Sequence, residues 1–143
     1  MIDHEASVGP EAMVDALVSA TNAHDLDALV ACFAEDYTNE TPAHPGRGFQ
    51  GRDQVRRNWE QIFAGVPDVN AVVLQMVVDG NTVWSEWEMR GTRLDGVPHV
   101  MRGVILFGVA GNHATSARFY LEPVDPDDGG GVDAAVRRAA GPS

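Results

Sequence analysis

The chain of 143 residues has a single cysteine, Cys32, and no hydrophobic run of membrane-spanning length. One cysteine excludes an intrachain disulfide, and its place beside an apolar helical stripe favours an inert packing role. The short apolar runs exclude a conventional transmembrane helix, so no membrane partner is expected. Residues 1–7 are polar and acidic, unlike a secretory signal, and we therefore expect a cytoplasmic protein.

Basic residues are also scarce. The sequence has 10 Lys and Arg against 21 Asp and Glu, a formal net charge of −11. Long-range repulsion then opposes binding to phosphate backbones, so we expect no nucleic-acid partner, although a buried basic group can still bind an acidic small molecule. His, Cys, Asp and Glu show no metal-site spacing, and no glycine-rich phosphate loop occurs. We therefore expect neither a metal nor a cofactor.

Helical periodicity dominates the first part of the chain. Pro10 suits the first turn of a helix that continues through about residue 22. Asp25 can cap a second helix, whose apolar stripe comprises Leu26, Leu29, Val30 and Phe33. A third helix is expected over residues 52–64. Residues 41–49, with two prolines and two glycines, predict a loop.

From Val69 onward the periodicity is that of strands. Strands are expected over residues 71–78, 82–93, 100–109 and 114–122, with hairpin turns at 79–81, 95–96 and 110–112. Three N-terminal helices before this meander predict an α+β fold, in which the helices pack on a curved, mostly antiparallel sheet. We expect one domain over residues 1–124 and a flexible tail over residues 125–143, with a short helix at 132–139.

The stretch from Asn22 to Pro42 carries a resemblance to a known family. It begins Asn22-Ala-His-Asp-Leu-Asp27 and continues as a helix into a polar strand, on which Tyr37, Asn39 and Thr41 share one face. Together with the order of elements over about residues 12–123, it resembles the nuclear-transport-factor-like fold. That superfamily includes steroid isomerases, limonene epoxide hydrolases and SnoaL-like polyketide cyclases. The resemblance implies a cone-shaped pocket between helices and sheet.

Two catalytic sets of that superfamily are not retained. Steroid isomerases place a proton-abstracting aspartate before the proline, where Thr41 stands, and Ile105 matches a residue of their oxyanion hole. Limonene epoxide hydrolases share the Tyr-x-Asn pair at Tyr37 and Asn39. Their Arg-x-Asp, however, is replaced by Trp87-Glu-Met89. A threonine hydroxyl is too weak a base to replace the aspartate, so neither reaction is expected by the known route.

The SnoaL-like cyclases match better at the end of the last strand. Their catalytic aspartate corresponds to Glu122, a carboxylate that is one methylene longer. Strand alternation places Arg118, Tyr120 and Glu122 on one face. An apolar pocket would disfavour the charged carboxylate and poise it for proton transfer. The alternative is a glutamate in solvent, or one paired with an arginine across the sheet.

The resemblance and the spacing together nominate two sets of site residues. Glu122 would be the base, Tyr37, Asn39 and Arg118 would orient the substrate or stabilise an enolate, and His44 is the next acid–base candidate. The expected ligand-binding residues are Thr41, Trp59, Phe63, Trp87, Met89, Met101, Ile105 and Tyr120. Most of them are apolar, which indicates an apolar small-molecule ligand; the alternative for each is plain core packing.

The leading function is a cofactor-independent enzyme for proton-transfer chemistry, such as cyclisation or isomerisation, on an apolar small molecule. The rival is a non-catalytic carrier or sensor on the same scaffold, favoured by the loss of two catalytic sets. Epoxide or ester hydrolysis comes third. A homodimer is expected through the outer face of the sheet, on which Trp84, Glu86, Glu88 and Arg90 would lie.

Overall fold

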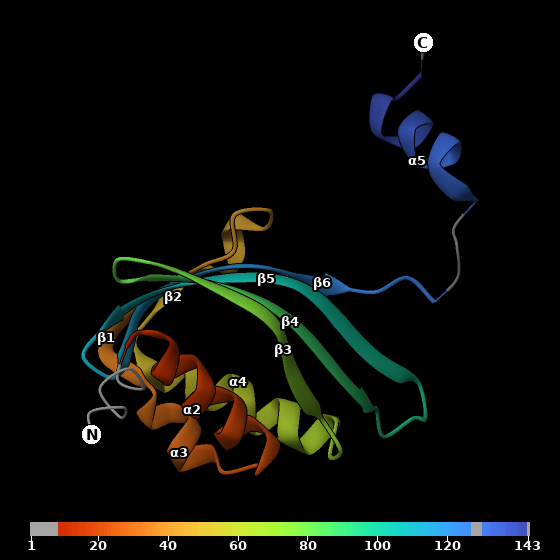
Figure 1. Ribbon diagram of the computed structural model, residues 1–143. Coiled ribbons are helices and arrows are strands. Elements are labelled where there is room, and N and C mark those ends of the chain that lie inside the picture. Colours follow the sequence, from red (N-terminus) through yellow and green to blue (C-terminus); the bar gives the residue numbers. More distant parts are fainter. Residues whose placement is uncertain (1–8, 127–129, 143) are drawn as a thin grey trace.

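The computed structural model describes residues 9–126 and 130–142 (Figure 1); the expectation for residues 1–7 lies outside them. The elements are α2 (Glu11–Asn22), α3 (Leu26–Ala31), β1 (Phe33–Glu40), the 3-10 helix η1 (Pro45–Arg47), β2 (Phe49–Gln50), α4 (Arg52–Gly65), β3 (Asn70–Asp79), β4 (Thr82–Thr92), β5 (Pro98–Ala110), β6 (His113–Pro123) and α5 (Gly131–Ala140). None of the described helices is long and apolar enough to cross a membrane.

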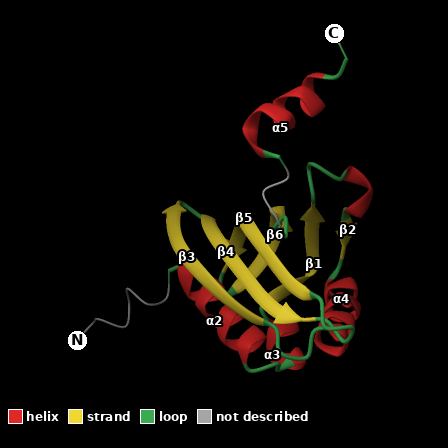
Figure 2. Ribbon diagram, turned by 90° about the vertical axis from the view of Figure 1, so that its right-hand side faces the viewer, coloured by secondary structure: helices red, strands yellow, loops and turns green. Residues whose placement is uncertain are grey.

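Six strands form one curved sheet in the order β2-β1-β6-β5-β4-β3. Every neighbouring pair is antiparallel except β1 and β6, which are parallel. The helices α2, α3 and α4 lie against the concave face, leaving the convex face uncovered by them (Figures 1 and 2). We call these the inner and outer faces. The fold is α+β with a mostly antiparallel sheet, as the sequence predicted.

The predicted hairpins are confirmed to within two residues at each strand end. Gly80 and Gly111 lie in the tight turns after β3 and β5, and both have a φ of 60°. Residues other than glycine rarely adopt that backbone conformation, because their Cβ atom clashes with the backbone. The two glycines therefore fix where each strand must reverse, which is why local sequence sufficed to locate the turns.

The second helix ends earlier than its apolar stripe predicted. Asp25 caps it as expected, because its Oδ1 accepts from the Ala28 N–H at 3.1 Å. The helix ends at Ala31, however, and Phe33 is the first residue of β1. The Ala114 N–H donates to the Cys32 carbonyl at 2.8 Å. Pairing with β6 thus decides the conformation here, and it overrides the helical spacing of Phe33.

Two residues expected to line the pocket belong to the core instead. Trp87 and Ile105 are 1% and 2% exposed. The Trp87 Nε1 donates to the Ser85 Oγ at 2.8 Å, and that hydroxyl donates to the Ile105 carbonyl at 2.7 Å. This buried chain of hydrogen bonds satisfies the indole, so Trp87 is a packing residue and its assignment to the pocket wall is corrected.

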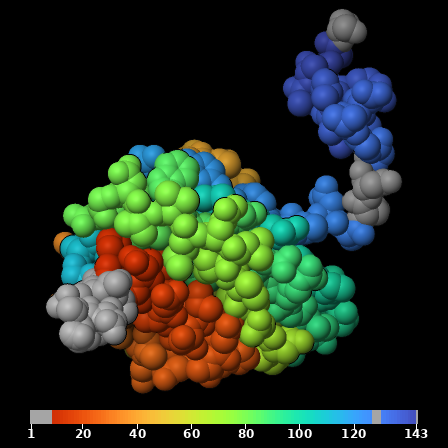
Figure 3. All heavy atoms as spheres, viewed as in Figure 1, coloured from red at the N-terminus to blue at the C-terminus, as the bar shows by residue number. Residues whose placement is uncertain are grey.

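The tail forms the helix α5, close to the 132–139 predicted from sequence. It buries no residue and stands away from the sheet and the other helices (Figure 3). The expectation of flexibility over residues 125–143 falls in part on residues 127–129 and 143, which lie outside the described residues. The tail thus adds nothing to the core that positions the site.

Candidate ligand-binding site

A cavity of about 280 Å³ lies between α4, the segment after β1 and the inner face of the sheet. We call it the inner cavity. Its lining is mainly aromatic and aliphatic: Phe33, Tyr37, Asn39, Thr41, Arg47, Phe49, Val55, Asn58, Trp59, Ile62, Met89, His99, Met101, Phe119 and Leu121. Within the described part of the chain, no Asp or Glu borders it. The space suits an apolar ligand with few polar groups.

Local periodicity explains how these side chains converge. Phe119 and Leu121 alternate along β6, and Tyr37 and Asn39 alternate along β1, so each pair faces the same side of the sheet. On α4 the lining positions recur at helical spacing, and include Val55, Asn58, Trp59 and Ile62. Four of the residues that the sequence nominated for ligand binding border the cavity: Thr41, Trp59, Met89 and Met101.

Tyr37 and Asn39 form a hydrogen-bonded pair. The Tyr37 hydroxyl donates to the Asn39 Oδ1 at 2.7 Å, and Tyr37 is fully buried. Burial raises the pKa of the Tyr37 phenol far above its ordinary value, so the group stays protonated and cannot serve as a base. Because the amide oxygen is occupied by Tyr37, Asn39 can offer its Nδ2 as a donor to a ligand.

The sequence did not nominate Arg47 and His99, yet both line the inner cavity. Among the described residues, neither side chain forms an ion pair or a hydrogen bond. His99 lies two residues before Met101, on the same strand. The alternation that placed Met101 inward could therefore have located His99 as well. Arg47 lies in η1, where no periodicity signals its direction.

The three polar residues near the end of β6 lie on the outer face. Since Phe119 and Leu121 face inward, alternation directs Arg118, Tyr120 and Glu122 outward. Tyr120 is 42% exposed. The expectation that Glu122 shares the cavity with Tyr37 and Asn39 is therefore wrong. The packing of the sheet on the helices decides which face of β6 covers the cavity. The local sequence carries no information about that choice.

The structure does bring Glu122 and His44 together, outside the inner cavity. The His44 Nε2 lies 3.1 Å from a carboxylate oxygen of Glu122, and both side chains are more than one-third exposed. Arg118 lies beside Glu40, with 3.4 Å between the Nε and the carboxylate. These are surface pairs between β6 and the chain around the end of β1. They hold that segment against the sheet.

Phe63 is the remaining residue expected to bind ligand, and it packs elsewhere. Its ring stacks on His24 at a centroid distance of 4.9 Å and contacts Trp59 at 5.5 Å. His24 in turn contacts the Val69 carbonyl through its Nε2 at 2.8 Å. Phe63 therefore ties α4 to the residues around α3, and it supports Trp59 without lining the cavity.

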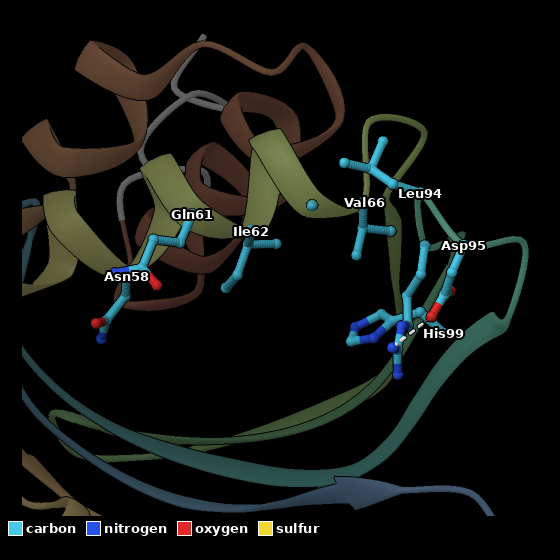
Figure 4. Close-up of a pocket in the computed structure, with 9 residues that line it drawn as sticks. Asn58, Gln61, Ile62, Val66, Leu94, Asp95 and His99 are labelled. Carbon is cyan, nitrogen blue, oxygen red and sulfur yellow. Dashed lines mark hydrogen bonds and ion pairs between the residues drawn. The ribbon is translucent and has the colours of Figure 1, made fainter.

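A second and more open space, of about 670 Å³, adjoins the first (Figure 4). We call it the outer pocket. It lies between α4 and the hairpin that joins β4 to β5, and is lined by Asn58, Gln61, Ile62, Gly65, Val66, Arg93, Leu94, Asp95 and His99. Asn58, Ile62 and His99 also line the inner cavity. The two spaces therefore meet at these three residues.

Both spaces are bordered by apolar side chains together with amide, guanidinium and imidazole groups, and the outer pocket also by the Asp95 carboxylate. In the described ranges, no three His, Cys, Asp or Glu side chains come together in a way that could hold a metal ion. Asn39 and Arg47 can donate hydrogen bonds, and the His99 imidazole can donate or accept one. The arrangement can hold an apolar body and orient an oxygen atom on it.

Comparison with known proteins agrees with this fold. A family model described as a SnoaL-like domain matches residues 14–117. A protein of ketosteroid isomerase-like fold from Catenulispora acidiphila DSM 44928, in complex with trimethylamine, is similar at 24% identity, with 78% of this chain and 86% of that chain covered and a TM-score of 0.67. No curated protein matches the chain significantly.

Two further solved structures have the same fold. IdmH of Streptomyces antibioticus, a candidate polyketide cyclase, shares 24% identity over 78% of this chain and 91% of its own, with a TM-score of 0.68. RV0760c of Mycobacterium tuberculosis, in complex with estradiol-17β-hemisuccinate, shares 18% identity over 78% and 93%, with a TM-score of 0.68. At these identities the likeness concerns the fold alone.

Proposed function

Because the chain belongs to the SnoaL-like domain family, we propose that it binds an elongated, apolar small molecule in the inner cavity. The observation that carries this proposal is the lining itself. Apolar side chains surround the space, and the few polar groups, such as the Asn39 amide, have hydrogen-bonding capacity to spare. We take the inner cavity as the closed end of the cone-shaped pocket that the family resemblance implies.

The strand register supports a long ligand. Asn39 lies opposite Ala117, whereas Met101 lies opposite Pro123. The stretch of β6 between these two partners spans about 20 Å at the usual rise per residue. His99 lies beyond Met101 on the same strand. The polar groups of Asn39 and His99 therefore stand at opposite ends of the cavity, with apolar side chains between them.

Two of the structurally similar proteins were solved with small organic ligands. One holds trimethylamine and the other estradiol-17β-hemisuccinate. The latter compound has a long, rigid, apolar ring system that ends in polar groups. Its shape agrees with a cavity that is apolar along its length and polar at its ends, and it is therefore the first compound to test here.

Proton-transfer chemistry, of the cyclase or isomerase type, is the second candidate. It is favoured by His99, which borders both spaces without a side-chain partner among the described residues. In such a reaction His99 would take a proton from a carbon beside a carbonyl, and the electron pair would move to the carbonyl oxygen. Tyr37 stays protonated, and none of the described Asp and Glu residues lines the inner cavity, so His99 is the base that the lining offers. Hydrolysis of epoxides has no such support.

Binding can be measured through tryptophan fluorescence, since Trp59 lines the cavity. We expect saturable quenching by estradiol-17β-hemisuccinate or by smaller apolar ketones. Leu121→Trp should abolish it by filling the cavity. Asn39→Leu should weaken binding of an oxygen-bearing ligand about three- to tenfold, the value of one hydrogen bond. Asn112→Leu, in an exposed turn, is the matched control.

The outcomes separate the two candidate functions. Equal affinity of wild type, Leu121→Trp and Asn39→Leu would show that ligands bind elsewhere. A compound that binds and is recovered unchanged supports the binding function. Turnover that disappears in His99→Gln, with affinity retained, supports the proton-transfer enzyme.

A further inference from the structure

We propose that the outer pocket is a second subsite, which holds a neutral, oxygen-bearing end of the same ligand whose apolar body fills the inner cavity. The inference rests on the function proposed above and adds the class of ligand: an elongated amphipathic molecule with a hydroxyl or carbonyl at one end.

The first argument is that the two spaces are continuous. Asn58, Ile62 and His99 line both. Figure 4 shows Asn58 and Ile62 on α4 and His99 on the opposite wall, so the passage runs between helix and sheet. Ile62 is apolar while Asn58 and His99 are polar. The lining thus changes from apolar to polar where the inner cavity opens into the outer pocket.

The second argument is that the outer pocket has spare hydrogen-bond donors. The Asn58 Oδ1 accepts from Gln54 at 2.8 Å, which leaves the Asn58 amide N–H groups free to donate. The Gln61 side chain has no partner among the described residues, and it is exposed to the pocket. Arg93 uses only part of its guanidinium on Asp95, at 2.6 Å. Such groups recognise acceptor oxygens.

The third argument concerns charge. The Asp95 carboxylate already neutralises Arg93, and the whole chain carries a formal net charge of −11. A carboxylate in the outer pocket would meet an arginine that is already paired, and the net charge of the chain would add long-range repulsion. A hydroxyl or carbonyl oxygen there meets neither. The ligand end that lies in the outer pocket is therefore neutral.

The fourth argument is the apolar rim of the outer pocket. Leu94, at the tip of the β4–β5 hairpin, is 79% exposed, whereas Val66 nearby is buried. A chain that leaves the inner cavity past Ile62 would pass these side chains and remove part of Leu94 from water. Burial of that surface would add to the affinity.

Three synthetic probes with one apolar body test the proposal: naphthyl hexyl ether, and the same ether with its chain ended by a hydroxyl or by a carboxylate. Naphthyl methyl ether, which has no chain, reports on the inner cavity alone. Dissociation constants are measured by calorimetry. We expect the hydroxyl-ended ether to bind about three- to tenfold more tightly than the hexyl ether, the value of one hydrogen bond. The carboxylate-ended ether should bind less tightly than the hydroxyl-ended one.

Two variants locate the polar end. Gln61→Leu and Arg93→Leu should each remove the advantage of the hydroxyl-ended ether and leave binding of the methyl ether unchanged, because neither residue lines the inner cavity. Glu60→Leu is the control, since Glu60 is the exposed neighbour of Gln61 on α4 and lines neither space.

Each result has a single meaning. If the methyl ether binds but the hydroxyl end brings no gain, or the gain survives both variants, the outer subsite is refuted while the inner cavity stands. If the carboxylate-ended ether binds more tightly than the hydroxyl-ended one, the inference that the polar end is neutral is wrong. If even the methyl ether does not bind, the proposed function fails and this inference fails with it.

Discussion

At the scale of single residues, burial and pairing separate polar groups that hold the fold from those that can meet a ligand. Ser85 and Tyr37 are enclosed, and their hydroxyls are engaged with other groups of the core. Asn39 and His99 border the cavity and retain hydrogen-bonding capacity. Substitutions in the first group should change stability, and substitutions in the second should change affinity.

Ser85→Ala should lower the free energy of unfolding by about 1–3 kcal/mol, because it leaves the buried Trp87 indole N–H without its acceptor. Urea denaturation followed by circular dichroism measures the change. Ser116→Ala, at an exposed position of β6, is the control and should cost far less. A Ser85→Ala variant as stable as wild type would mean that the indole is satisfied in some other way.

In Tyr37→Phe, the free energy of unfolding should fall less steeply with rising alkaline pH than it does in wild type. Burial raises the pKa of Tyr37 in the folded state, so the folded protein holds the phenolic proton more tightly than the unfolded chain. The protonated phenol makes its full contribution to the free energy of unfolding below about pH 10. That contribution is lost as the pH rises further, at up to about 1.4 kcal/mol per pH unit. Urea midpoints measured on either side of that pH test this.

Tyr120→Phe provides the matched control for Tyr37→Phe, because it removes a phenol that is 42% exposed. It should keep the wild-type slope. Tyr37→Phe should also be less stable than wild type at neutral pH, since the Asn39 Oδ1 loses its donor. An unchanged alkaline slope in Tyr37→Phe would contradict the raised pKa.

At the scale of elements, the segment between β1 and β2 places Thr41 and Arg47 beside the inner cavity. It is held by short-range backbone bonds, such as the Arg47 N–H to the His44 carbonyl at 2.9 Å. The His44–Glu122 pair ties it to β6. The sequence suggested that these two residues act in catalysis. Their placement supports a positioning role for the segment.

Glu122→Ala should release this segment with little effect on global stability. Both partners are more than one-third exposed, so the pair contributes less than about 1 kcal/mol to the free energy of unfolding. Amide hydrogen exchange at Arg47 and Gly48 should become faster, and that of β5 should not. A loss of turnover in Glu122→Ala with unchanged exchange would instead support Glu122 as the base that the cyclase resemblance implied.

At the scale of the whole molecule, the outer face of the sheet carries an exposed apolar patch. The register aligns its members, which are Val77, Trp84, Val104, Leu106 and Tyr120. Val77 and Trp84 are 62% and 49% exposed. Glu88 also lies on this face; its hydrogen bond with Arg90 holds the pKa of that carboxyl below its usual range. An exposed apolar patch surrounded by charges is typical of a protein–protein interface.

We therefore expect a homodimer through the outer face at micromolar concentration, measured by light scattering. Trp84→Glu should shift it to a monomer, because a charge would be buried at the centre of the patch. Val132→Glu is the control, since Val132 is 75% exposed on α5, away from the sheet. A wild-type monomer would refute the expectation, and a Trp84→Glu dimer would place the interface elsewhere.

Local patterns were sufficient for most of the fold. The helix at Arg52–Gly65 and the strands of the meander follow from periodicity and turn residues, which act over a few positions. The parallel pairing of β1 with β6, and the short strand β2, were not predicted. The strands β1 and β6 lie far apart in the chain, and no local signal announces their pairing. The strand β2 is only two residues long and lies at the end of the loop predicted for residues 41–49, too short for a periodicity to show. Arg47 was likewise not predicted as a site residue, because it lies in the short 3-10 helix η1, where no periodicity signals the direction of its side chain.

The sequence by itself determined the type and order of the longer helices and strands, the family, and the fact that Glu122 shares a face with Tyr120 and opposes Leu121. Those properties depend on backbone preference and side-chain alternation, which are local. Only the tertiary structure decided which face of β6 borders the cavity and that Trp87 belongs to the core. The choice of face depends on how the whole sheet packs against α2, α3 and α4. Alternation along a strand defines two faces, but only that packing decides which of them faces the helices.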